Sequence, residues 1–151
     1  MLTLMLSTAC AGIFSGAALY INFVEHPARV WCGTESAVRA FRPSYQRATL
    51  MQAPLAAAGS ILGLAAAWQL QDPLVALAAV LFGAVVPYTL LVMYPTNRQL
   101  LDPGLDFRSA RAASLLARWN KLHWVRSALA ATAFALLLYR ASSPPPHLGL
   151  R

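Results

Sequence analysis

The sequence contains little charge, and this shortage excludes most classes of soluble protein. Charged residues make up 11% of the 151 residues, whereas hydrophobic residues make up 58%. A water-soluble domain has roughly 25% charged residues, because its surface has to be solvated. We therefore predict that lipid, and not water, surrounds most of this chain.

Three further absences narrow the fold class and the chemistry. No stretch alternates apolar and polar residues at every second position, as the strands of a membrane barrel require. The two cysteines, Cys10 in an apolar run and Cys32 in a loop, are poorly placed to meet, which disfavours a disulfide. No glycine-rich phosphate-binding motif is present, so a nucleotide cofactor is not expected.

Apolar residues are instead gathered into four long runs. A helix of roughly 20 apolar residues spans the hydrocarbon core of a bilayer, and lipid offers no hydrogen-bond partner to irregular backbone. We therefore predict an all-α membrane protein, a bundle of four transmembrane helices in one domain over residues 1–141. The predicted spans cover residues 2–24, 48–70, 74–93 and 119–139. The proline-rich segment 142–151 is predicted to be a flexible tail.

The basic residues predict an orientation. Of the twelve Lys and Arg residues, ten lie in or beside the two long connections: Arg29, Arg39, Arg42, Arg47, Arg98, Arg108, Arg111, Arg118, Lys121 and Arg126. The positive-inside bias then places both long loops in the cytoplasm and both termini outside, in a bacterial inner membrane. Nothing resembles a nucleic-acid-binding module, so the basic residues are expected to contact membrane lipids and not nucleic acid.

Short interfacial helices are expected in both long loops. In the first loop, Val38, Phe41 and Tyr45 recur at helical spacing, and Pro43 is expected to bend this helix into the second span. In the second loop, alanine and leucine are interspersed with arginine over residues 110–117, which indicates another amphipathic helix.

Small residues predict where the helices pack closely. Gly12 with Gly16 and Gly59 with Gly63 are pairs four residues apart, a spacing that lets transmembrane helices approach each other. These faces could pack within the bundle, against a second copy of the chain, or against a larger membrane complex. Pro87 lacks an amide donor and is expected to kink or loosen the third span.

Polar residues cluster at the same predicted end of three spans. A polar side chain in the membrane is costly when unpaired and therefore usually faces the interior of a bundle. The cluster consists of Tyr20, Asn22, Glu25 and His26, of Tyr94 and Asn97, and of Trp119, Asn120, His123 and Arg126. In the predicted topology all three groups lie at the cytoplasmic side, so we expect them to converge on one pocket.

Three motifs within this cluster carry a resemblance. They are His26-Pro27-Ala28, Pro95-Thr96-Asn97-x-x-Leu100 and Trp119-Asn120-x-x-His123-x-x-Arg126. In this order and spacing they resemble the anthrone-oxygenase-like family of small four-helix membrane proteins, over nearly the whole chain. The resemblance implies a four-helix bundle. It also implies an oxygenase that uses dioxygen without flavin or haem, on a lipophilic aromatic or quinol-like substrate, because family members in polyketide pathways oxidise anthrones to anthraquinones.

The residue chemistry suits such a reaction. An acidic C–H bond beside a ketone needs a base in a pocket of low dielectric constant, and neutral imidazole can fill that role. His123 is the first candidate for the base and His26 is the second. Asn97, Asn120 and Arg126 are candidate donors to the developing enolate oxygen. Substrate contacts are assigned to the rest of the cluster: Trp119, Tyr94, Asn22 and Tyr20.

Other functions remain open at this point. His26, His123 and Glu25 could instead bind iron, copper or zinc, although they lack a tight spacing motif. The cluster could be a structural network that locks the bundle. The chain could also be a non-enzymatic accessory subunit, a small-molecule binder or a transporter. The other half of the bundle is almost purely apolar, which argues against a transport path.

Overall fold

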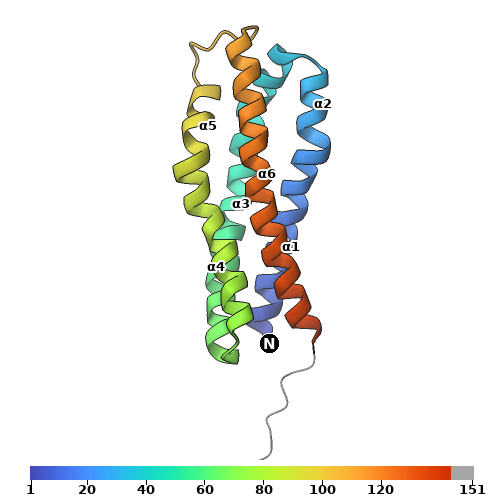
Figure 1. Ribbon diagram of the computed structural model, residues 1–151, viewed down its shortest axis with the longest axis vertical. Helices are drawn as coiled ribbons and strands as arrows, with labels where there is room; N and C mark the ends of the chain where they lie inside the picture. The colour runs from blue at the N-terminus through green and yellow to red at the C-terminus, as the bar shows by residue number, and fades with distance from the viewer. Residues whose placement is uncertain (144–151) are drawn as a thin grey trace, which may run out of the picture.

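Four long antiparallel helices form the protein in a computed structural model, which describes residues 1–143 (Figure 1). In chain order the elements are α1 (Leu2–Tyr20), η1 (Ile21–Glu25), α2 (His26–Trp31), α3 (Thr34–Leu70), α4 (Pro73–Tyr88), η2 (Thr89–Met93), α5 (Tyr94–Leu100) and α6 (Ala110–Ser142). The π-helical segments η1 and η2 join their neighbours without a break. The chain therefore forms four rods: α1 to α2 is the first, α3 the second, α4 to α5 the third and α6 the fourth. The predicted tail lies, from residue 144 onward, outside the described residues.

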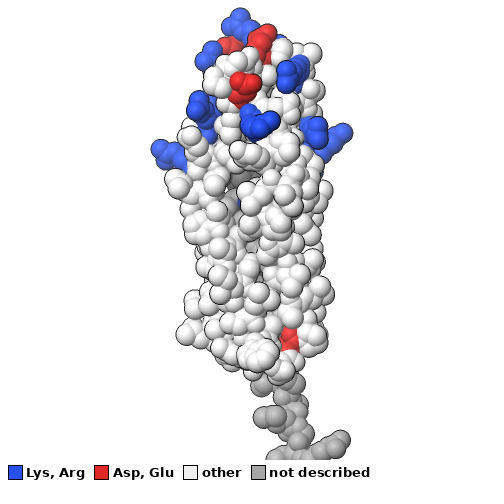
Figure 2. Space-filling model, turned by 90° about the vertical axis from the view of Figure 1, so that its left-hand side faces the viewer, with Lys and Arg blue, Asp and Glu red and all other residues white. Residues whose placement is uncertain are grey.

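The exposed surface of the bundle is apolar. All four rods are long and apolar enough to cross a membrane. Large side chains such as Trp68 (79% exposed), Leu50 (78%) and Leu91 (76%) point outward, where only lipid would cover them favourably. On the face seen in Figure 2, charged side chains gather at the end that carries the long connections. The predicted fold class, an all-α integral membrane protein with four spanning helices, is therefore confirmed.

The helices extend beyond the predicted spans and absorb the expected interfacial helices. The helix predicted after Gly33 is present, but it is the start of α3, which continues through Pro43 as far as Leu70. Residues 110–117 are likewise the first turns of α6. Pro43 is exposed, and its missing amide leaves the carbonyl group of Arg39 unpaired; Arg39 is also exposed, so water can bind this group. One lost hydrogen bond there does not end the helix.

Tight packing around one glycine pair holds the second rod to its neighbours. α1 and α4 each pack against both α3 and α6. A methyl group added at Gly59 would lie 2.8 Å from Cys10 Cβ, and one added at Gly63 would lie 2.8 Å from Ala79 Cβ. Ser7 Oγ also donates a 2.8 Å hydrogen bond to the carbonyl oxygen of Gly59. The face formed by Gly59 and Gly63 therefore packs inside the bundle. It is not free to contact a second chain, which was one of the alternatives that the sequence left open.

The other glycine pair divides between two environments. A methyl group added at Gly12 would lie 2.9 Å from the ring of Phe134 on α6, whereas nothing lies within 4 Å of one added at Gly16. Of the two, only Gly16 leaves its surface open for lipid or for another protein.

Two π-helical turns interrupt the first and third rods at the same depth. The amide of His26 bonds to the carbonyl of Ile21, and the amide of Tyr94 bonds to that of Thr89, so each bond spans five residues instead of four. In both cases the next residue is a proline, which cannot donate and crowds the preceding turn. The wider turn accommodates it. α4 continues through Pro87, so the irregularity of the third rod lies beyond that residue and not at it.

The buried core consists of two clusters with a gap between them. In the cluster near the α3–α4 turn, the rings of Phe14 and Phe82 meet edge to face with centroids 5.4 Å apart. In the cluster near the charged end, Phe41 and Trp119 meet in the same way at 5.3 Å. Side chains from η1, η2 and both clusters surround the space between them, and this space is the pocket described below.

An ion pair closes the opposite end of the bundle. Asp72 caps the start of α4 by accepting hydrogen bonds from the amides of Leu74 (2.9 Å) and Val75 (3.3 Å). Its other oxygen pairs with Arg140 near the end of α6, and both side chains are largely buried. Burial alone would raise the pKa of Asp72, but the hydrogen bonds from Arg140 and the two amides outweigh it, so the pKa lies below its ordinary value.

Asp72→Asn should lower the apparent free energy of unfolding in detergent by about 1.5–3 kcal/mol, the range for a hydrogen bond to a charged group. Asparagine keeps the helix cap, so the loss reports the ion pair. Because the pKa of Asp72 is lowered in the folded state, the difference from wild type should persist at neutral pH and shrink as the pH falls below about 4. Arg140→Gln should cost a similar amount, and additive losses in the double variant would contradict the pairing.

Candidate functional site

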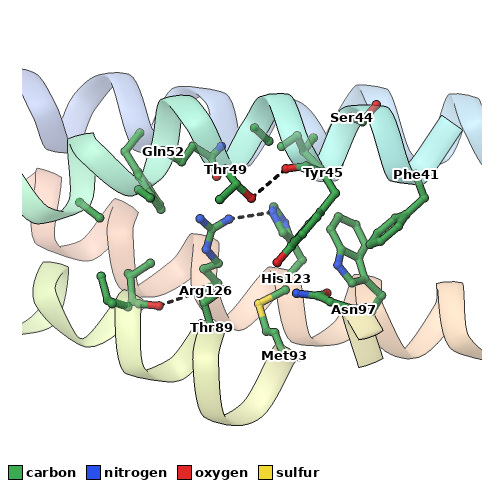
Figure 3. Close-up of a pocket in the computed structure, with 18 of the residues that line it drawn as sticks. Phe41, Ser44, Tyr45, Thr49, Gln52, Thr89, Met93, Asn97, His123 and Arg126 are labelled. Carbon is green, nitrogen blue, oxygen red and sulfur yellow. Dashed lines mark hydrogen bonds between the residues drawn. The ribbon is translucent and has the colours of Figure 1, made fainter. Parts of the chain in front are cut away.

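A pocket of about 170 Å³ lies between the two core clusters, close to the charged end (Figure 3). All four rods contribute to its wall. The residues that line it include Phe14, Phe41, Tyr45, Thr49, Gln52, Ala53, Val86, Leu90, Met93, Asn97, Trp119, His123 and Arg126. Three of the predicted catalytic residues, Asn97, His123 and Arg126, therefore share one cavity. Trp119 and Glu25, one of the alternative metal ligands, also line it.

Asn22 holds the His123 ring in one orientation by a hydrogen bond to its Nδ1. The side chain of His123 is buried, and its Nδ1 lies 2.9 Å from Oδ1 of Asn22 on η1. Asn22 Oδ1 also accepts a 2.5 Å hydrogen bond from Ser127 Oγ. Since this oxygen can only accept, Nδ1 of His123 must donate, and the lone pair of the neutral ring is on Nε2. This nitrogen is the one on the side of Arg126.

Arg126 places a positive charge in the pocket without a carboxylate beside it. Its Nη1 lies 3.3 Å from His123 Nε2, and its guanidinium carbon lies 4.7 Å from the centre of the Phe14 ring. The ion pairs within residues 1–143 join other arginines to Glu25, Glu35 and Asp72. Arg126 Nε is buried without a hydrogen-bond partner. A cation buried in this way favours a ligand that is, or becomes, negatively charged.

Several other polar atoms of the pocket wall also lack partners within the described chain. They are both side-chain atoms of the Asn97 amide, Nε1 of Trp119 and Nε2 of Gln52. Asn97 and Gln52 are 1% and 2% exposed, so bulk water does not reach them freely. Unpaired buried polar groups are rare in folded proteins because each costs free energy. Their concentration around one cavity is typical of a site that a ligand or ordered water completes.

His26 lies outside this pocket. Its ring is separated from His123 by Trp119, whose ring centre is 5.3 Å from that of His26 and 4.7 Å from that of His123. His26 and Asn120 instead line a second, shallower groove on the opposite side of Trp119. Asn120 accepts a 3.5 Å hydrogen bond from Asn22 and is thereby connected to His123 only indirectly. The structure thus separates the two candidate bases.

Two tyrosines and one asparagine that were expected to contact the substrate lie elsewhere. Tyr20 and Tyr94 are 57% and 48% exposed on the outer surface and do not line the pocket. Asn22 is buried behind His123 and acts on its ring instead of facing the cavity. Of the four expected substrate contacts, only Trp119 is part of the pocket wall.

The alternative metal ligands are not assembled into a site. No group of three or more His, Cys, Asp or Glu side chains in the described part of the chain is arranged to hold a metal ion. Glu25 forms an ion pair with Arg29 and accepts a 3.1 Å hydrogen bond from Ser44, and His123 is bound to Asn22. Glu25 and His123 therefore have separate partners, and the ring of His26 packs against Trp119.

Sequence reasoning did not identify the residues that α3 contributes to the pocket wall. Tyr45, Thr49 and Gln52 all line the pocket, and their spacing of four and three residues places them on one helical face. A glutamine within an otherwise apolar span was the available signal, since such a residue is expected to face the interior. Tyr45 was instead assigned to an interfacial helix.

The fold and the site together define a class: an integral membrane protein with a four-helix bundle and a pocket near the charged end of the bundle. The sequence model of the anthrone oxygenase family matches residues 41–136, and the chain belongs to this family. The match includes Asn97, His123 and Arg126 but not His26. Searches of curated proteins and of solved structures found no significant match.

Proposed function

We propose that this protein is an oxygenase that oxidises a lipophilic aromatic or quinol-like compound with dioxygen in the pocket around His123. The observation that carries the proposal is the state of His123. Asn22 occupies Nδ1, so the lone pair of the ring is on Nε2, which lies on the side of the cavity and accepts a 3.3 Å hydrogen bond from Nη1 of Arg126, a guanidinium without a carboxylate partner. A positioned base can remove a proton from a carbon acid, and a neighbouring cation can stabilise the anion that this leaves on the substrate.

The reaction would begin with transfer of a proton from an activated methylene group of the substrate to His123 Nε2. The negative charge would collect on the conjugated oxygen, within reach of donors from Arg126 and Asn97. The electron-rich carbon would then bond to dioxygen and form a peroxide. Loss of the second proton from that carbon would break the O–O bond. The products are a carbonyl group and one molecule of water, which balances one methylene group and one molecule of dioxygen.

No flavin, haem or metal is needed for this sequence, because the substrate carbanion itself supplies the electrons to dioxygen. We therefore propose that the protein works without a cofactor. Apolar side chains and Trp119 surround the base and keep the site poor in water, which strengthens the interaction between Arg126 and the developing anion.

The position of the pocket supports an enzyme or a binding protein more than a transporter. The pocket lies at one end of the bundle, and a packed cluster of apolar side chains fills the other half. We further propose that the charged end faces the cytoplasm of a bacterial cell and that the protein lies in the inner membrane, since the basic residues of both long connections gather there.

Oxygen uptake by the purified protein in detergent tests the proposed function. Anthrone-like and quinol-like compounds should be supplied in turn, and a substrate with an activated methylene group should consume one molecule of dioxygen per carbonyl formed. Turnover should survive treatment with a metal chelator and should not follow the iron, copper or zinc content. If compounds bind but none consumes oxygen, the protein is a binder or an accessory subunit. If a chelator abolishes turnover and one metal restores it, the cofactor-free reaction is wrong.

A further inference from the structure

We propose that the pocket takes a single aromatic ring with oxygen substituents at two opposite positions, and that an aliphatic chain on this ring leaves the protein between α3 and η2 to lie in the bilayer. The inference rests on the proposed function and names its substrate as a 1,4-diol of one ring. Such a ring has no methylene group to oxidise: its two hydroxyl protons and two electrons would pass to dioxygen, which gives the quinone and one molecule of hydrogen peroxide, and His123 Nε2 would take up the first proton. The inference concerns binding and can be tested without turnover. Three observations carry it: the volume of the pocket, the positions of its unpaired amides, and the side on which its wall is exposed.

The volume suits one ring. The pocket encloses about 170 Å³, and an apolar protein cavity of roughly 150 Å³ is known to hold benzene. Protein interiors are close-packed and resist expansion, so a fused system of three rings would need either the helices to separate or its outer rings to project through the open side of the pocket. One substituted ring fits the cavity as it stands.

Unpaired amides mark the two ends of the pocket. Figure 3 shows Gln52 at one end and Asn97 at the other, with His123 and Arg126 between them. Gln52 Nε2 and both side-chain atoms of Asn97 have no hydrogen-bond partner in the described chain. An amide can donate or accept, so each end can bind a hydroxyl or a carbonyl oxygen. A ring with oxygen atoms at opposite positions would pair both amides and lie beside His123 and Arg126.

One side of the pocket opens toward lipid. Among its lining residues, Thr49 and Ala53 on α3 and Val86 and Leu90 on the third rod are exposed, and three of these four side chains are apolar. Figure 2 shows a hollow in the apolar wall just below the charged end.

The side of the pocket toward the charged end is closed by polar contacts. Glu25 pairs with Arg29 on α2 and accepts a 3.1 Å hydrogen bond from Ser44 on α3, and these contacts tie the first rod to the second. An aliphatic chain would therefore pass between α3 and η2 into the bilayer, where it would stay in hydrocarbon.

A blocked opening provides the first test. Para-dihydroxybenzene with and without a decyl chain would be titrated anaerobically into the protein in detergent, with calorimetric detection. Leu90→Trp should weaken binding of the chain-bearing ligand about tenfold, because the indole fills the exit, and leave the chain-free ring unchanged. Leu91→Trp is the matched control, since Leu91 is exposed on the same turn but does not line the pocket. Equal effects of the two variants, or equal weakening of both ligands by Leu90→Trp, would overturn the proposed exit.

Gln52 provides the second test. Gln52→Leu keeps the approximate size of the side chain but removes its amide, and it should weaken binding of the chain-bearing diol about five- to tenfold. A chain-bearing ring with one hydroxyl group, which can use the Asn97 end, should bind the variant and the wild type alike. An equal loss for both ligands, or no loss for the diol, would show that Gln52 does not bind the second oxygen.

The outcomes separate this inference from the proposed reaction. If a three-ring anthrone binds more tightly than the chain-bearing single ring and is oxidised, the substrate class is wrong and the oxygenase function stands. If the chain-bearing ring binds with the expected sensitivity to Leu90→Trp and Gln52→Leu but no compound consumes oxygen, the substrate class stands and the oxygenase function is wrong.

Discussion

Replacing His123 with alanine should lower the rate of substrate-dependent oxygen uptake by about 10²–10⁴-fold, the usual contribution of a general base. No other imidazole of the described chain lies in the pocket to take over, because His26 is on the far side of Trp119. The loss should appear in kcat more than in KM, since the imidazole acts on the reacting proton. Measurement of initial rates with an oxygen electrode checks this result.

His26→Ala is the matched control for His123→Ala. Both variants remove an imidazole packed against Trp119, but only His123 faces the pocket. We expect His26→Ala to keep turnover within a fewfold of wild type. Thermal unfolding of both variants in detergent would show whether they are folded. Full turnover by folded His123→Ala, or an equal loss in folded His26→Ala, would refute the assignment of the base.

Arg126→Gln should lower kcat by about 10²–10³-fold, the cost of removing one preorganised donor to a developing oxyanion. Glutamine can still donate a hydrogen bond but carries no charge, so the variant tests electrostatic stabilisation. Arg126→Lys keeps the charge and should recover part of the rate, although lysine lacks the planar fork of donors. Rates for the three proteins at saturating substrate check the prediction.

Ligand binding distinguishes this role from a structural one. A neutral ligand should bind Arg126→Gln about as well as it binds wild type, whereas a phenolate or carboxylate analogue should bind less tightly by more than tenfold. Arg126 contacts Phe14 and His123, so a merely structural role would weaken both kinds of ligand alike. Equal binding losses, or unchanged turnover in folded Arg126→Gln, would contradict the proposed stabilisation of charge.

The polar cluster was predicted to converge at one depth, and its buried members meet there. Asn22 and His123, 101 residues apart in the chain, are bound to each other, and Asn97 reaches the same pocket. The shared depth of these residues follows from local sequence, because each polar group stands next to the end of an apolar run. Depth in the membrane depends on composition, which a sequence records directly.

The direction of each side chain around its helix was predicted less well. Tyr94 directly follows η2 and points outward, and Tyr20, which precedes η1, also points outward. A π-helical turn adds one residue to the helix, and each residue turns the chain by roughly 100°. Residues beyond such a turn therefore face a direction that regular helical spacing does not predict. Met93 and Asn97, four residues apart, line the pocket, whereas Tyr94 does not.

The sequence alone determined the membrane environment, the four helices and the end at which the polar groups gather. These properties depend on composition and on neighbours along the chain. Lipid favours the helical form of an apolar segment, whichever other helices it packs against. Only the tertiary structure decided that His123 and not His26 faces the cavity, that Gln52 closes one end of it, and that the wall is exposed between α3 and η2. Those features depend on how each helix is rotated and on which distant side chains it meets, and the packing of the whole bundle sets both.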